Sequence, residues 1–171
     1  MDEATFIRNW HQLNNAFDHP SIDKDIKYKR CGWHIVQMRQ LGETVDNEMR
    51  NNIVDSRYAK FRASKLLVLK VYDMRADRFV SGIHHIWNGG VSINYNVGET
   101  AIPNGFAEDI HVICDKGIHY FNTLFAAYCY HSNDVLDFYD SGQFDRLCFD
   151  SSPGENQIWF DALLFQCNVI C

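Results

Sequence analysis

The segment SKLLVLKVYDM (Ser64–Met74) decides the fold class. It is too continuously apolar for a half-exposed strand, and it is too short and too rich in β-branched residues for a helix. Such a run is typical of a central strand that is buried on both faces. The sequence therefore predicts a sheet with this segment in its interior.

Three further segments follow the central strand. RFVSGIHHIW (78–87) and VSINYNVGE (91–99) flank Asn88-Gly89-Gly90, a turn that needs positive φ, and so predict an antiparallel hairpin. On such a strand His84 and His85 point to opposite faces. CDKGIHYFNTLFAAYCY (114–130) predicts a strand followed by a short Ala-rich helix.

Upstream, the pattern changes to a helical one. The large apolar residues near the N-terminus share one helical face: Phe6, Trp10, Leu13 and Phe17. CGWHIVQM (31–38) predicts a strand, and the polar run 43–57 predicts a second, mostly exposed helix with Val45, Met49, Ile53 and Val54 on its apolar face.

Together these elements predict an α+β fold, a mainly antiparallel sheet with two or three helices in a single compact domain over residues 1–171. Within it we expect an N-terminal extension of helix and strand (1–59), a central block (60–131) and C-terminal strands (132–171). The last of these strands, IWFDALLFQCNVIC (158–171), is apolar enough that it must be buried.

The net charge of −6 argues against a nucleic-acid partner, because binding the phosphate backbone relies on many Lys and Arg side chains. Basic residues nevertheless cluster near aromatic ones: Lys24, Lys27, Lys29, Arg30, Arg57, Lys60, Arg62 and Lys65. Interleaving of this kind is also found on nucleic-acid faces. Given the acidic total, we expect these side chains to be solvated.

The six cysteines are irregularly spaced and predict reduced thiols in a reducing compartment. The start of the chain does not resemble a signal peptide, and no apolar run is long enough to span a membrane. Cys114, His119 and Cys129 are candidate zinc ligands, but without a Cys-x-x-Cys pair we predict no metal and no cofactor.

Three blocks carry a resemblance to a known family. They are Phe61-Arg62-Ala63-Ser64-Lys65, Tyr95-Asn96-Val97-Gly98-Glu99, and Cys114 with Gly117-Ile118-His119-Tyr120-Phe121. In this order they resemble a domain of unknown function found in proteins of large DNA viruses and some bacteria, often beside pentapeptide repeats. The chain departs from the pattern in Ala63, which replaces a cysteine, in Tyr120, which replaces a phenylalanine, and in the HHIWNGG insert.

This resemblance implies a viral, non-enzymatic interaction or structural module. We expect it to be virion-associated, as a minor capsid or accessory protein, with virion or host proteins as partners. Its expected location is the virion or the host cytoplasm.

GIHYFNTLFAAYCY (117–130) is also similar to a segment of poly(ADP-ribose) polymerase-like transferases. That similarity implies an alternative function, an ADP-ribosyltransferase-like enzyme or an NAD- or ADP-ribose-binding domain. His119 and Tyr128 would enclose the nicotinamide ring, Arg62 would hold the ribose, and Glu155 would be the catalytic acid, although it lies in a Ser-Pro-Gly loop. Ordinary core packing produces the same strand and helix pattern.

Overall fold

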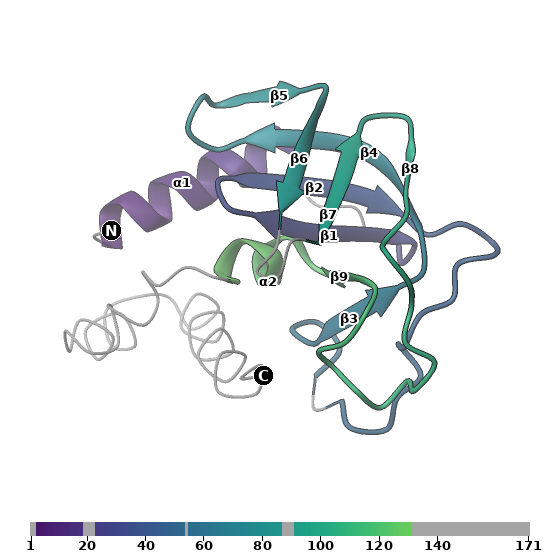
Figure 1. Ribbon diagram of the computed structural model, residues 1–171. Coiled ribbons are helices and arrows are strands. Elements are labelled where there is room, and N and C mark those ends of the chain that lie inside the picture. Colours follow the sequence, from purple (N-terminus) through teal and green to yellow (C-terminus); the bar gives the residue numbers. More distant parts are fainter. Residues whose placement is uncertain (1–2, 19–22, 54, 87–90, 131–171) are drawn as a thin grey trace.

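The predicted central strand is β4 (Leu66–Asp73) of the computed structural model, which describes residues 3–18, 23–53, 55–86 and 91–130 (Figure 1). The predicted C-terminal strands (132–171), Glu155 and the turn Asn88-Gly89-Gly90 lie outside these residues. β4 pairs with three strands, all antiparallel: β2 (His34–Arg39), β5 (Arg78–Val80) and β8 (Thr100–Ala101). The prediction of a strand inside the sheet is therefore confirmed.

The sheet continues from β2 through three more antiparallel strands. These are β1 (Ile26–Cys31), β9 (Ile118–Phe121) and β3 (Lys60–Ala63). The strand order is β3-β9-β1-β2-β4-β5, with β8 attached to β4. This sheet curls into a half-barrel, and with the helices α1 (Glu3–Ala16) and α2 (Leu124–Cys129) it forms one α+β domain, as the sequence predicts.

A separate hairpin of β6 (Gly82–Ile86) and β7 (Ser92–Asn96) packs over the concave side of the half-barrel (Figure 1). It confirms the predicted antiparallel pair. Gly82 is required where the two strands approach, because a Cβ at this position would lie 2.5 Å from Asn96 Oδ1.

Two hydrophobic cores lie on the two sides of the sheet. The first joins the sheet to α1 and α2, and its largest members are Phe6, Leu13, Phe17, Tyr28, Tyr72, Phe121 and Tyr128. The second fills the half-barrel beneath the hairpin, and its largest members are Met38, Phe61, Val68, Tyr95, Ile118 and Tyr120. None of the helices in the described part of the chain is long and apolar enough to cross a membrane.

Two sequence predictions about the first half of the chain need correction. The strand expected over 31–38 is a hairpin, in which β1 ends at Cys31, Gly32 turns with a φ of +59° and β2 begins at His34. The helix expected over 43–57 is wrong, because the described residues of this run form turns and a bridge between Asp46 and Ala63.

Side chains explain why that second helix does not form. Asp46 Oδ1 accepts from the Glu48 amide at 2.8 Å, and Asn47 Oδ1 accepts from the Arg62 amide at 2.7 Å. Asp and Asn compete with helical hydrogen bonds in this way. The run is therefore held along β3, and Met49, expected on an apolar face, is 89% exposed.

Candidate functional site

Every buried charged side chain in the described part of the chain is basic. The buried lysines and arginines are Lys27, Lys29, Arg30, Arg50, Lys60 and Arg62, accompanied by His119. The prediction of solvated faces is therefore wrong for five of the eight clustered basic residues: Lys27, Lys29, Arg30, Lys60 and Arg62. Burial of so many cations needs compensating acceptors. The structure supplies them for Lys27, Arg30 and Arg62, whereas Nε and Nη1 of Arg50 have no acceptor among the described residues.

Lys27 and Arg30 stabilise the fold. Lys27 Nζ donates to Glu48 Oε1 at 2.6 Å and to Asn122 Oδ1 at 2.8 Å, which links β1 to the segments before β3 and before α2. Arg30 donates to the carbonyls of Gly32 and Tyr128. Both side chains join elements that are far apart in the sequence.

Arg62 organises the segment between β8 and β9. Its guanidinium is fully buried and donates to four carbonyl oxygens, those of Ala107, Asp109, Val112 and Lys116, at 2.7 to 3.2 Å. Since four of its five N–H groups are used in this way, Arg62 fixes the loop that precedes β9.

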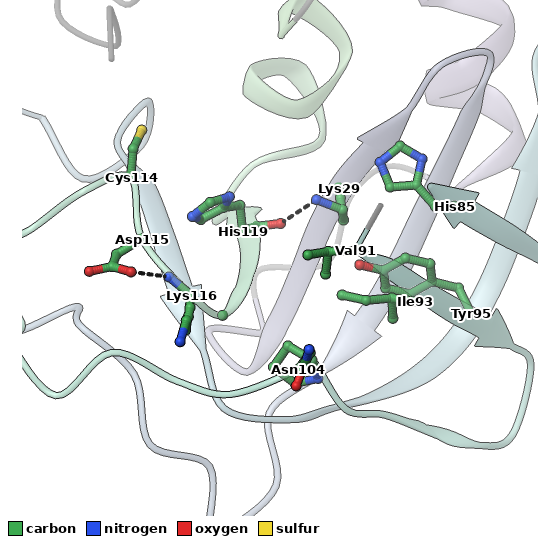
Figure 2. A pocket seen from close by; sticks show the side chains of 12 residues that line it. Lys29, His85, Val91, Ile93, Tyr95, Asn104, Cys114, Asp115, Lys116 and His119 are labelled. Atoms are coloured by element: carbon green, nitrogen blue, oxygen red, sulfur yellow. Dashed lines mark hydrogen bonds between the residues drawn. The ribbon is translucent and has the colours of Figure 1, made fainter. Parts of the chain in front are cut away.

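This loop forms one wall of a cavity of about 330 Å³ (Figure 2). The sheet contributes Lys29 and His119, and the hairpin contributes His85, Ile93 and Tyr95. The remaining lining residues come from the loops: Val91, Pro103, Asn104, Cys114, Asp115, Lys116 and Gly117. The cavity is large enough for a small ligand or for one side chain of a partner.

The cavity lies where two strands separate. β1 and β9 share one register pair, Tyr28 with Phe121, and beyond it the strands diverge. Lys29 crosses this gap, and its Nζ donates to the carbonyl of His119 at 3.2 Å (Figure 2). The amine of Lys29 therefore takes the place of a backbone donor at the edge of the cavity.

The polar groups of the cavity have shifted protonation equilibria. Burial lowers the pKa of Lys29. Burial, followed by the positive charges of Lys29, Lys60 and Arg62, lowers the pKa of His119 to about 3, so its imidazole is neutral near pH 7. Burial raises the pKa of Tyr95, so its phenol is protonated.

Tyr95 is a second donor in the cavity. Its side chain is fully buried, and its hydroxyl has no hydrogen-bond partner in the part of the chain that the structure describes. A buried hydroxyl of this kind costs free energy unless a water or a ligand binds it.

The structure separates the residues that the transferase similarity brings together. Tyr128 packs in the helix-side core, with its ring centroid 4.8 Å from Phe6 and 5.7 Å from Trp10, and its hydroxyl donates to the Phe6 carbonyl. His119 lines the cavity and Arg62 holds the loop. In this structure, His119, Tyr128 and Arg62 therefore do not line one cavity.

The candidate zinc ligands are separated as well. Cys114 and His119 line the cavity, but Cys129 lies in the helix-side core, where burial raises the pKa of its thiol. Cys114 is disulfide-bonded, so the prediction of reduced cysteines is wrong at this position. Within residues 3–18, 23–53, 55–86 and 91–130, no three His, Cys, Asp or Glu side chains are placed to hold a metal.

Fold and cavity together define a small antiparallel half-barrel with a basic, ligand-sized pocket under a hairpin. The chain belongs to a family of unknown function, DUF5758, whose profile matches residues 14–127. This confirms a domain of unknown function, which begins well before the block predicted at residue 60 and includes every residue that lines the cavity. No curated protein and no solved structure matches the chain.

Sequence reasoning missed Lys29 and Tyr95 as site residues. Lys29 belongs to a basic cluster that resembles a solvated strand, and Tyr95 lies in one of the family-like blocks without any local sign of a role. The only available signal was the alternation of lysines with Tyr28 in β1, a pattern that a strand buried on both faces also permits.

Proposed function

We propose that this domain is a non-enzymatic interaction module that binds an acidic group of a partner in the cavity. The observation that carries the proposal is the buried amine of Lys29 at the cavity, which the side chain of Tyr95, with its donor hydroxyl, also lines. A carboxylate entering the cavity would accept hydrogen bonds from both groups. Hydrogen bonds to an ionised acceptor in a buried site are the strong ones.

Electrostatics support an acidic ligand over a basic one. Lys60 and Arg62 lie close enough to lower the pKa of His119, so they also contribute positive potential there. A carboxylate that binds at Lys29 favours the ammonium form of the amine, so binding is coupled to proton uptake. The ligand should therefore bind more tightly as the pH falls toward the pKa of the free Lys29 amine.

The apolar side chains that line the cavity indicate the chemistry of the rest of the ligand. Val91 and Ile93 line the cavity together with Lys29 and His119 (Figure 2). A short apolar chain that ends in a carboxylate fits this mixed lining, as does an acidic side chain or a C-terminus of a protein partner.

The separation of His119 from Tyr128 favours the interaction module over the ADP-ribosyltransferase-like alternative. The viral origin, the association with virions and the location in the virion or host cytoplasm rest on the sequence resemblance alone, and we propose them on that basis.

Thermal-shift titration with straight-chain carboxylates from acetate to octanoate, at constant ionic strength, tests the proposal. We expect a concentration-dependent rise in Tm that is absent with the matching neutral amides. Lys29→Met should abolish the shift, whereas Lys24→Met, which removes an exposed lysine, should retain it. A wild-type Tm that no carboxylate raises would overturn the proposal, and a rise with NAD or ADP-ribose alone would favour the transferase-like alternative.

A further inference from the structure

The guanidinium of Arg50 is buried, and two of its nitrogens lack acceptors. Arg50 is 5% exposed, and its Nε and Nη1 have no hydrogen-bond partner in the part of the chain that the structure describes. Arginine keeps its proton in proteins, so this buried group is a cation. Burial of a cation whose donors are not satisfied is costly, and folded proteins normally satisfy such donors with a partner group, a bound ion or ordered water.

The contact that Arg50 does make is with an aromatic ring. Its guanidinium carbon lies 4.8 Å from the centroid of the Phe61 ring in β3. The face of the ring attracts the positive charge, but it is a weak substitute for an oxygen acceptor. The contact therefore positions the guanidinium and leaves Nε and Nη1 to be satisfied by another group.

The acidic residue closest to Arg50 in the sequence is engaged elsewhere. Glu48 Oε1 accepts from Lys27 Nζ at 2.6 Å and from the Tyr120 hydroxyl at 2.7 Å. Glu48 thus pairs with a cation of β1 and a phenol of β9, and it does not supply the acceptors that Arg50 lacks.

The charges around Arg50 favour an anion. Burial lowers the pKa of Arg50, and the charge of Arg62 lowers it further. Tyr120 would offset this effect only as a phenolate, and burial raises its pKa, so it stays neutral. Burial also lowers the pKa of Lys60 to about 8, with contributions from the charges of Lys29 and Arg50. An anion beside Arg50 would therefore be attracted by several cations.

The backbone that holds Arg50 is fixed on both sides. The amide of Arg50 donates to the carbonyl of Asn47 at 3.3 Å, and the buried side chain of Asn47 donates to the Ile110 carbonyl at 3.3 Å. Two residues beyond Arg50, Asn52 Nδ2 donates to the His111 carbonyl at 3.2 Å. This run is tied to the loop before β9 at both ends, so Arg50 is held in place before a ligand arrives.

We propose that Arg50 binds an oxyanion, a phosphate or carboxylate group whose oxygens accept hydrogen bonds from Nε and Nη1. The planar array of donors in arginine matches the oxygens of such groups. Met49 and Asn51, which flank Arg50 in the chain, are exposed, so the guanidinium lies beneath a surface turn that an ion can reach. Arg50 does not line the cavity, and this site is independent of the proposed function.

Thermal-shift titration of the full chain with sodium phosphate, against sodium chloride at equal ionic strength, tests this inference. We expect Tm to rise with the phosphate concentration. Arg50→Met should abolish the rise, whereas Arg57→Met, which removes an exposed arginine, should retain it. Arg50→Lys should weaken phosphate binding about tenfold, because lysine keeps the charge but not the planar array of donors. Circular dichroism verifies that each variant is folded.

Lys29→Met separates this site from the cavity. This variant lacks the amine that lines the cavity but keeps Arg50, so the rise in Tm with phosphate should persist. Titration of the same variant with sodium acetate then distinguishes a site that accepts any carboxylate from one that requires a phosphate group.

A direct readout comes from the arginine Nε–H signals in the ¹⁵N NMR spectrum of the wild-type chain. The signal that is absent from the spectrum of Arg50→Lys belongs to Arg50. It should shift with the phosphate concentration until the site is saturated, whereas a residue with only a structural role would show no such change. This measurement decides the question even if Arg50→Met does not fold.

An Arg50 Nε–H signal that phosphate and acetate leave unchanged would overturn the inference. Loss of the rise in Tm in Lys29→Met but not in Arg50→Met would also overturn it, and would place the anion in the cavity of the proposed function. A phosphate effect that requires Arg50 and not Lys29 would support the site at Arg50, even if carboxylates fail to bind in the cavity.

Discussion

Replacement of Arg62 by methionine tests whether this residue stabilises the loop before β9. Methionine keeps an unbranched stem of similar length and removes all the donors that reach the four loop carbonyls. Hydrogen bonds contribute about 1 kcal/mol each, and their carbonyls lie in a partly exposed segment where water can replace the guanidinium. Relief of the desolvation that lowers the pKa of Arg62 offsets part of the loss, so we expect the free energy of unfolding to fall by about 3 kcal/mol.

Urea denaturation followed by circular dichroism measures this change, with two control variants. Arg62→Lys retains a cation but cannot reach all four carbonyls, so its stability should lie between those of the wild type and Arg62→Met. Arg57→Met removes an exposed arginine paired with Asp55 and should change the free energy of unfolding by at most about 1 kcal/mol. Hydrogen exchange should accelerate at residues 107–117 in Arg62→Met while β4 remains protected. If Arg62→Met were as stable as Arg57→Met, or if exchange in the loop were unchanged, the role assigned to Arg62 would be refuted.

Two further predictions concern pH and backbone packing. His119 has a pKa of about 3 in the folded chain against about 6.5 in an unfolded one, so the unfolded chain binds more protons between these values. The stability of the fold should therefore fall as the pH is lowered from 6.5 toward 3, by up to about 1.4 kcal/mol per pH unit from this residue, and His119→Gln should show a shallower slope in urea titrations. Gly82→Ala should lower the free energy of unfolding by about 1–3 kcal/mol, because the new methyl group would meet Asn96 Oδ1 at 2.5 Å and the Tyr95 carbonyl oxygen at 2.8 Å. An unchanged urea midpoint for Gly82→Ala would contradict this prediction, because it would show that β6 and β7 can move apart without a loss of stability.

Elements with a strong local pattern could be predicted from the sequence. The unbroken apolar run of β4 and the helical spacing of Phe6 and Leu13 in α1 both lead to the observed structure, because each pattern records the face that is buried. The Ala-rich run after Thr123 does the same for α2, whose first turn Thr123 caps.

Strand β1 could not be predicted in this way. Its lysines, Lys27 and Lys29, are polar by composition but buried, because their amines reach acceptors that come from distant parts of the chain, such as Glu48 and the His119 carbonyl. The cavity has the same origin, since its walls come from segments around residues 29, 85, 91–95 and 103–119. A local sequence pattern does not show which distant segments come together, because their contact depends on how far the sheet curls.

The burial of cations also determines how a ligand approaches. The chain has a net charge of −6, and the buried charged side chains among its described residues are all basic, so the charges that this part of the chain exposes are more acidic than its total charge. An acidic ligand would therefore meet repulsion at long range and attraction only near the cavity. Added salt screens the distant charges most, so it should speed the association of a carboxylate with this domain, the opposite of the usual effect of salt on an encounter between opposite charges.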